Sequence, residues 1–171
     1  PGETVLDACA APGGKTMQIA ELMKGQGTLV AMDPAADRLK PLRENVARLR
    51  WDFINVVERD ITKDTTPTRY DAILLDVPCT NTGVIRRRPD ARWRFSAERV
   101  RAACGKQAAI LDAAAARLNA RGRIVYSTCS LELEENEGQV DRRLPRHPEF
   151  RLADSRKLFP PASQTDGAYA A

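Results

Sequence analysis

The chain has 171 residues, 43% of them hydrophobic, which is enough for a globular domain with a buried core. It has no apolar run of membrane-spanning length and no charged-then-apolar signal pattern at its start, so we expect neither a membrane protein nor a secreted one. Lys and Arg number 27 against 23 Asp and Glu, and this net charge of +4 is by itself a weak indication of a polyanionic partner.

Apolar, β-branched segments alternate along the chain with segments of helical periodicity. Strands are predicted at residues 4–8, 28–33, 54–57, 70–75, 123–127 and 150–152. Helices are predicted at residues 16–24, 36–50, 100–119 and 133–144. This alternation predicts an α/β fold, a three-layer sandwich with a mainly parallel sheet covered on both faces. The chain begins just before one strand and ends inside another, so we expect residues 1–171 to be one domain cut at both ends.

The segment DACAAPGGKT at residues 7–16 joins the first predicted strand to its helix. Its small residues let the backbone approach a ligand, and the amino terminus of the helix favours an anionic group. The phosphate-binding pattern G-x-x-x-x-G-K-[ST] and the dinucleotide pattern G-x-G-x-x-G are both absent. A merely structural turn is the alternative.

Two aspartates follow the next strands. Asp33 ends the second strand, where a carboxylate can accept hydrogen bonds from ribose hydroxyls, and Asp60 lies just past the third, where it can accept from an adenine amino group. Either residue alone would be read as a turn or helix cap. Together they suit a nucleoside ligand, and the glycine pattern favours S-adenosylmethionine over a dinucleotide.

Four cysteines are present, and Cys79 and Cys129 each follow a predicted strand. No C-x-x-C pair occurs and the single histidine is far along the chain, so we expect no zinc site. Reduced thiols in a cytoplasmic protein are the default. If the fourth and fifth strands are neighbours, the two thiols share one pocket, whereas Cys9 and Cys104 fit buried packing.

Two thiols and an acid match the needs of methylation at carbon 5 of cytosine. A thiolate that adds to carbon 6 makes carbon 5 nucleophilic toward a sulfonium methyl group, and an acid near ring N3, for which Asp76 is placed, stabilises the adduct. The chemistry alone does not decide which thiol attacks. An enzyme of RNA with Cys129 as nucleophile and an enzyme of DNA with Cys79 as nucleophile both remain possible.

Three motifs are similar to those of a known family: DACAAPGGKT at residues 7–16, DVPCTNTGVIRRRPD at 76–90 and YSTCSLELEENE at 126–137. They resemble the Fmu/Sun family of RNA cytosine-C5 methyltransferases, and within it the bacterial enzymes of 16S ribosomal RNA. The resemblance implies a class I S-adenosylmethionine-dependent methyltransferase fold and an RNA substrate. It implies that Cys129 attacks cytosine and that Cys79 assists proton removal or product release. The residues that it places at the S-adenosylmethionine site are Cys9, Ala10, Ala11, Pro12, Gly13, Gly14, Lys15, Asp33, Arg38, Asp60 and Asp76.

Seven arginines lie between residues 84 and 101, some of them beside aromatic residues. Cations suit phosphates and aromatic rings suit unstacked bases, so we expect RNA contacts here and a single-stranded or loop cytosine as target. The residues concerned are Arg86, Arg87, Arg88, Arg92, Trp93 and Arg94. The alternatives are a solvated loop that packs its tryptophan into the core, and an RNA-binding module without activity.

The motifs depart from the family at Asn81, where many relatives have Gly or Ala, and at Ala168, which replaces an aromatic residue. The four glutamates of residues 132–137 are interpreted as the solvated face of a helix.

Overall fold

A computed structural model describes residues 1–171 as two compact units. The first unit comprises Pro1–Asp76 and Ile110–Val125, and the second comprises Val77–Ala109 and Tyr126–Ala171. Helix α4 (Ala97–Ala115) and strand β5 (Leu118–Thr128) each have one end in either unit. The strands follow one another in the order β3-β2-β1-β4-β5-β7-β6. None of the helices combines the length and the apolar character that crossing a bilayer requires.

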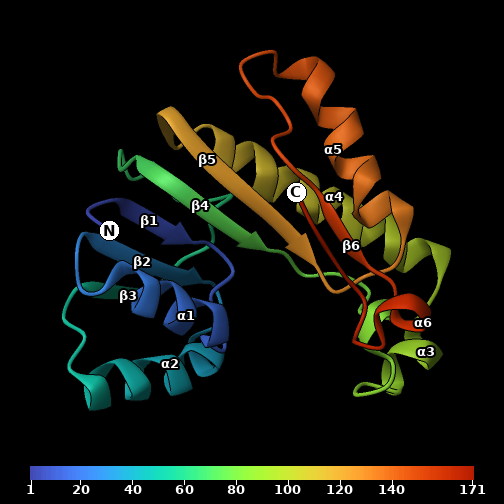
Figure 1. The fold of residues 1–171 in the computed structure, drawn as a ribbon, viewed down its shortest axis with the longest axis horizontal. Coiled ribbons are helices and arrows are strands. Elements are labelled where there is room, and N and C mark those ends of the chain that lie inside the picture. Colours follow the sequence, from blue (N-terminus) through green and yellow to red (C-terminus); the bar gives the residue numbers. More distant parts are fainter. The chain divides into compact units, whose positions relative to one another are not determined.

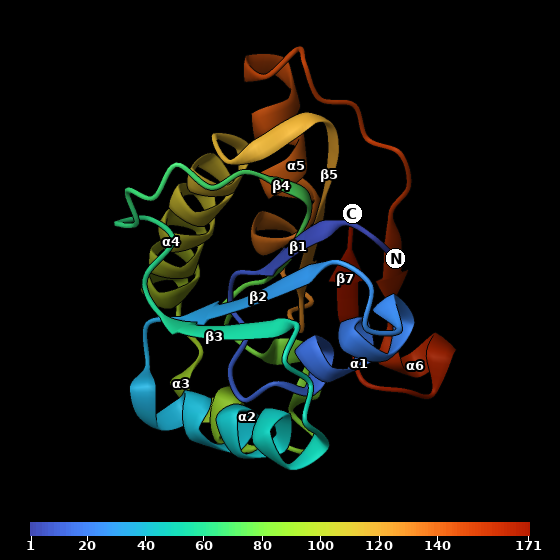
Figure 2. The same cartoon turned by 90° about the vertical axis from the view of Figure 1, so that its left-hand side faces the viewer.

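Four parallel strands organise the first unit. They are β1 (Thr4–Asp7), β2 (Thr28–Asp33), β3 (Ile54–Glu58) and β4 (Tyr70–Asp76). β1 pairs with β2 on one side, where Thr4 lies beside Thr28, and with β4 on the other, where Val5 lies beside Ala72. β3 pairs with the far side of β2. Helices α1 (Gly14–Met23) and α2 (Ala36–Leu49) lie on one face of β1, β2 and β3, as Figures 1 and 2 show.

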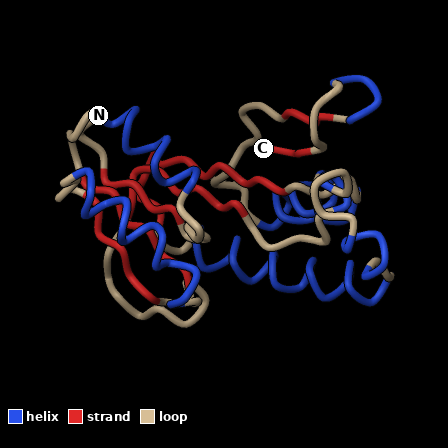
Figure 3. Tube along the Cα trace, turned by 90° about the horizontal axis from the view of Figure 1, so that it is seen from below, coloured by secondary structure: helices blue, strands red, loops and turns tan.

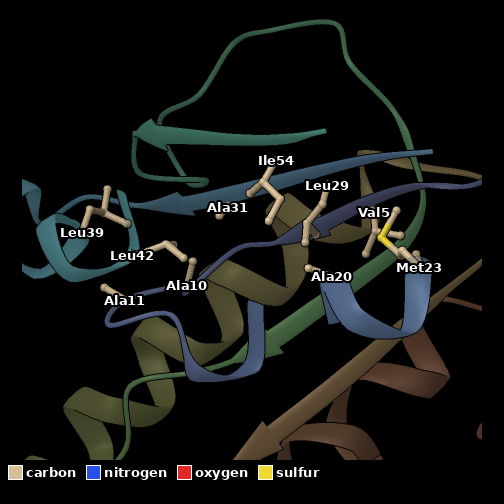
Figure 4. Close-up of a cluster of buried hydrophobic side chains, with 11 residues drawn as sticks. Val5, Ala10, Ala11, Ala20, Met23, Leu29, Ala31, Leu39, Leu42 and Ile54 are labelled. Carbon is tan, nitrogen blue, oxygen red and sulfur yellow. The ribbon is translucent and has the colours of Figure 1, made fainter. Parts of the chain in front are cut away.

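The core of the first unit lies between these two helices and the sheet (Figure 4). α1 contributes Ala20 and Met23, α2 contributes Leu39 and Leu42, and the strands contribute Val5, Leu29, Ala31, Ile54 and Ala72. Leu6 and Ile73 alternate with these strand residues, so they face the other side of the sheet, and they are buried too. Burial on both faces explains why the strands read as continuous apolar runs.

Shorter elements form much of the second unit. After β4 come the 3-10 turn η1 (Thr82–Val84), helix α3 (Asp90–Arg94) and the first half of α4; after β5 come η2 (Leu133–Glu135), α5 (Glu137–Arg143), η3 (Leu144–Arg146), β6 (Arg156–Leu158), α6 (Pro160–Ser163) and β7 (Ala168–Ala170). β7 runs antiparallel to the end of β5 and to β6, so the chain ends between two strands (Figure 3).

The predicted α/β fold and the mainly parallel sheet are confirmed, but several elements differ from prediction. Helix α4 ends at Ala115, and residues 118–119 begin β5 instead, because Leu118 is buried and the Arg117 carbonyl already accepts a hydrogen bond from the Tyr70 amide. The helix expected at 133–144 is interrupted at Asn136, whose side chain turns inward to Thr128 and Ser130. The strand expected at 150–152 is wrong, since β6 pairs with β7 instead.

Candidate functional site

The loop between β1 and α1 belongs to the first unit and carries most of the predicted cofactor residues, Cys9 to Lys15. Gly13 has a φ of 117°, and a Cβ atom at this position would come within 2.8 Å of Leu42 Cδ1. Gly13 is therefore required both by its backbone conformation and by the close packing of α2. At Gly14, in contrast, an added Cβ atom would meet nothing within 4 Å, so the loop faces open space there.

Asp33 and Arg38 hold this loop in place. The amide of Ala11 donates to Asp33 Oδ2 at 3.2 Å, and Arg38 Nη2 donates to the Ala11 carbonyl at 2.8 Å. Asp33 is almost fully buried, and its other oxygen accepts from the amide of Ala35 at 3.0 Å. The structure thus brings these two predicted site residues to the loop. Each carboxylate oxygen has two lone pairs, so these bonds leave acceptor capacity for a ligand hydroxyl.

Asp7, at the end of β1, is a buried acid whose role the sequence analysis did not identify. Its Oδ2 accepts from Thr16 Oγ1 at 2.6 Å, while Oδ1 is buried and has no hydrogen-bond partner. Burial raises the pKa of Asp7 to about 6 and is also the main reason that the pKa of Cys9 rises to about 12. The Cys9 thiol therefore stays protonated, in agreement with its interpretation as an unreactive cysteine.

Asp60 lies just past the end of β3 and Asp76 ends β4, both in the first unit. Asp60 Oδ1 accepts from the amide and the hydroxyl of Thr62, at 2.9 and 2.7 Å, and the hydroxyl bond is the main reason that its pKa is lowered. These two bonds form a local turn, which is the alternative interpretation of Asp60 given by the sequence. Asp76 Oδ2 pairs with Lys15 Nζ at 2.7 Å, which joins two predicted site residues from distant parts of the sequence.

The second unit brings the two predicted reactive thiols together. Cys79 Sγ and Cys129 Sγ lie 3.3 Å apart, and neither residue is fully buried. The thiol of Cys129 donates to Asn81 Oδ1 at 3.0 Å, and the Asn81 amide donates to the Cys79 carbonyl at 3.1 Å. Asn81, where the motif departs from the family, therefore contacts both cysteines. Its backbone φ is 62°, in the left-handed region that asparagine adopts more readily than most residues.

The contact between the sulfurs affects the titration of Cys79. The pKa of Cys79 is raised above its usual range, first by its hydrogen-bond contact with the sulfur of Cys129 and second by burial. Cys79 therefore resists losing its proton while the two sulfurs stay in contact.

A buried carboxylate links the two cysteine loops. Glu135 is fully buried and accepts from the amide and the hydroxyl of Thr80, from Ser130 Oγ at 2.8 Å and from Gln107 Nε2 at 2.8 Å. Thr80 follows Cys79 and Ser130 follows Cys129, so one side chain fixes both loops. The prediction that Glu135 lies on a solvated helix face is wrong, because these donors provide the hydrogen bonds that a buried carboxylate requires.

Most of the predicted RNA-binding residues are exposed. Trp93 is 81% exposed, so the alternative in which it packs into the core is wrong, and Arg92 lies 5.6 Å from its ring. Arg87 pairs with Asp166 and Arg94 pairs with Asp90. Arg86 and Arg88 are exposed as well. These residues occupy α3 and the loop before it, where the sequence analysis expects only a loop.

The mainly parallel sheet, with the strand order given above, has the fold of class I S-adenosylmethionine-dependent methyltransferases. Solved structures that share it include two from Pyrococcus horikoshii. NSun6 from Pyrococcus horikoshii, determined with SFG, matches with a TM-score of 0.86 and 31% identity over 98% of this chain and 46% of that one. A methyltransferase homologue from the same organism matches with a TM-score of 0.84 and 31% identity over 99% of this chain and 60% of that one.

The chain belongs to the 16S rRNA methyltransferase RsmB/F family, whose model matches residues 1–171. Ribosomal RNA small subunit methyltransferase B of Vibrio cholerae is 41% identical over 176 residues, which cover 98% of this chain and 40% of the relative. The probable enzyme of this name from Synechocystis is 41% identical over 154 residues, 88% of this chain and 34% of the relative. The resemblance found in the sequence is confirmed, and the chain spans two fifths or less of these relatives.

Proposed function

We propose that this chain transfers a methyl group from S-adenosylmethionine to carbon 5 of a cytosine in RNA, with 16S ribosomal RNA as the substrate. The observation that carries the proposal is the 3.3 Å approach of the Cys79 and Cys129 sulfurs, which lie on the loops that follow β4 and β5. Ordinary packing does not require two partly exposed thiols to meet. Covalent activation of a pyrimidine ring requires a nucleophile and a helper close together.

The loop of the first unit suits the proposed cofactor. The unpartnered, buried Oδ1 of Asp7 and the open space at Gly14 are features that a bound ligand would use. Cys9 to Lys15 would line the methionine end, and Asp33 and Arg38, which already fix the Ala11 backbone, would hold the ribose end. The cofactor supplies an electrophilic methyl group on a sulfonium.

Cys129 is the proposed nucleophile. Its sulfur adds to carbon 6 of cytosine, and the electron pair of the ring double bond moves to carbon 5, which then forms the bond to the methyl group. Cys79 stays out of the attack and assists the release step. A base takes the carbon-5 proton, the electron pair of that bond re-forms the double bond between carbons 5 and 6, and the Cys129 sulfur leaves as a thiolate that takes a proton from the adjacent Cys79 thiol. The family motifs favour this assignment over the alternative in which Cys79 attacks.

Asp76 is the proposed acid near ring N3. Its ion pair with Lys15 has to open, or shift to the substrate, before Asp76 reaches the ring. Lys15 therefore has a second part in the proposal, since it holds this carboxylate at the end of β4 until the substrate arrives. Asp60 would complete the adenosine end with the oxygen that Thr62 does not occupy.

The decisive experiment compares two cysteine variants with a cytosine-containing RNA and radiolabelled cofactor. We expect Cys129→Ala to abolish methylation and to form no covalent complex. We expect Cys79→Ala to accumulate a protein–RNA adduct that survives denaturing electrophoresis, because the adduct then forms but resolves slowly. The opposite assignment of adducts would favour Cys79 as nucleophile. Calorimetry with S-adenosylmethionine tests the remaining alternative, since a module without activity has no need to bind it.

A further inference from the structure

A cationic pocket adjoins the Cys79 loop within the second unit. It is a cavity of about 220 Å³ between that loop, α3 and the first half of α4. Cys79 and Asn81 form one wall, and the charged residues around the rest are Arg88, Arg94, Arg99 and Lys106, with Asp90 as the acid. Asp90 pairs with Arg94, so three of the four cations keep their charge uncompensated.

The sequence of α4 explains how the pocket is made. Arg99, Ala102, Ala103 and Lys106 are spaced at i, i+3, i+4 and i+7, so they lie on one face of the helix. The two alanines leave room above the helix surface, and the two cations stand at either end of that space, roughly 10 Å apart along the axis. Arg101 lies on the same helix, but it pairs with Glu98 and does not line the pocket.

We propose that this pocket, which we name the phosphate pocket, binds phosphodiester groups of the RNA strand next to the target cytosine. The inference rests on the proposed function and adds the part of the substrate that the site holds. The lining has an excess of positive charge and only one aromatic side chain, Phe95, so it suits a phosphate backbone rather than a stacked base. Because Cys79 forms part of its wall, a strand held here has its neighbouring base beside the thiols.

The phosphate pocket differs from the RNA surface that the sequence predicts. Arg88 and Arg94 belong to both, but Arg86, Arg92 and Trp93 do not line the pocket. Arg99 and Lys106 are not among the residues that the sequence predicts to contact RNA. They line the pocket because they share one face of α4. These two residues therefore test the pocket separately from the exposed arginine cluster.

The test compares the double variant Arg99→Gln/Lys106→Gln with the wild-type protein. Binding of a single-stranded, cytidine-containing oligoribonucleotide is measured by fluorescence anisotropy across a salt series. Each phosphate contact contributes about 0.7 to the slope of log affinity against log salt. Raising salt from about 50 to about 200 mM should therefore weaken wild-type binding about sevenfold more than it weakens binding of the variant. The KM for RNA should rise while kcat stays within about twofold.

The control variant Arg43→Gln/Arg101→Gln removes the same amount of charge from exposed positions outside the pocket. It should keep more of the wild-type salt slope than the pocket variant. Equal slopes for the two variants would overturn the phosphate pocket, whereas a wild-type protein that binds and methylates no cytosine in RNA would overturn the proposed function instead. Titration with inorganic phosphate separates the two sources of the anion. If the pocket variant loses affinity for phosphate but keeps its affinity for RNA, the assignment to RNA is wrong.

Discussion

The substitution Glu135→Gln tests whether the buried carboxylate positions the two thiols. In the variant, the amide oxygen can take the place of Oε2 and keep the bonds from the Thr80 amide and from Gln107, while the hydroxyls of Thr80 and Ser130 rotate to accept from the new NH₂ group. All four charge-assisted bonds then become neutral ones, at a cost of about 1–1.5 kcal/mol each, and part of this cost is recovered because a neutral amide is cheaper to bury than a charge. We expect a total loss of about 2–3 kcal/mol, which lowers Tm by about 4–12 °C in a chain of this size.

The kinetic effect distinguishes positioning from mere stability. Because Glu135 holds residues next to both cysteines, its replacement shifts the sulfurs, and displacements of about 1 Å reduce rates by up to about 100-fold. We expect kcat for RNA methylation, measured well below Tm, to fall about 10- to 100-fold while the Kd for S-adenosylmethionine stays unchanged. The control is Glu134→Gln, at an exposed neighbour. A Glu135→Gln enzyme that is less stable but turns over at the wild-type rate would refute the positioning role.

Two further predictions concern the cofactor loop. The pKa of Asp7, about 6 in the fold against 3.8 ordinarily, means that its stabilising contribution is present below pH 3.8 and is lost as the pH rises through 6. The unfolding free energy of Asp7→Asn relative to wild type, measured with urea, should therefore increase by about 3 kcal/mol between about pH 4 and about pH 7, and a difference independent of pH would contradict this. Gly13→Ala should lower stability by roughly 1–3 kcal/mol and weaken binding of S-adenosylmethionine, because the new methyl group meets Leu42 at a positive φ. Gly14→Ala, which meets no atom, should leave thermal stability nearly unchanged.

The convergence of the thiols could be predicted from the sequence because it depends on topology. Cys79 and Cys129 each follow a strand, and neighbouring parallel strands carry their carboxyl ends to the same edge of the sheet. The cofactor loop could be predicted for a similar reason, since its glycines and the aspartate after β2 form a local pattern. The boundary between α4 and β5 could not, because alanine favours helix on both sides of residue 115 and only the pairing with Tyr70 ends it.

The hydrogen bonds to Glu135 could not be predicted from the sequence, for a different reason. A run of glutamates is normally solvated, and nothing local shows that Glu135 is buried while Glu134 is exposed. Its donors come from Thr80 and Gln107, 55 and 28 residues away in the chain. The sequence does carry one indication of its importance, because Glu135 belongs to the family motif at residues 126–137 and lies six residues after Cys129.

The buried carboxylate is difficult to explain by stability alone. Taking a charge out of water costs several kcal/mol even when hydrogen bonds replace the water, and apolar residues of similar volume are often as stable in such places. Glu135 instead joins the residue after Cys79 to the residue after Cys129, so a movement of either loop breaks a bond to the same side chain. The Asn81 side chain also bonds to both cysteines, so two polar residues hold the loops whose sulfurs lie 3.3 Å apart. Such directional bonds suit a pair of thiols that has to act on one ring in a fixed order.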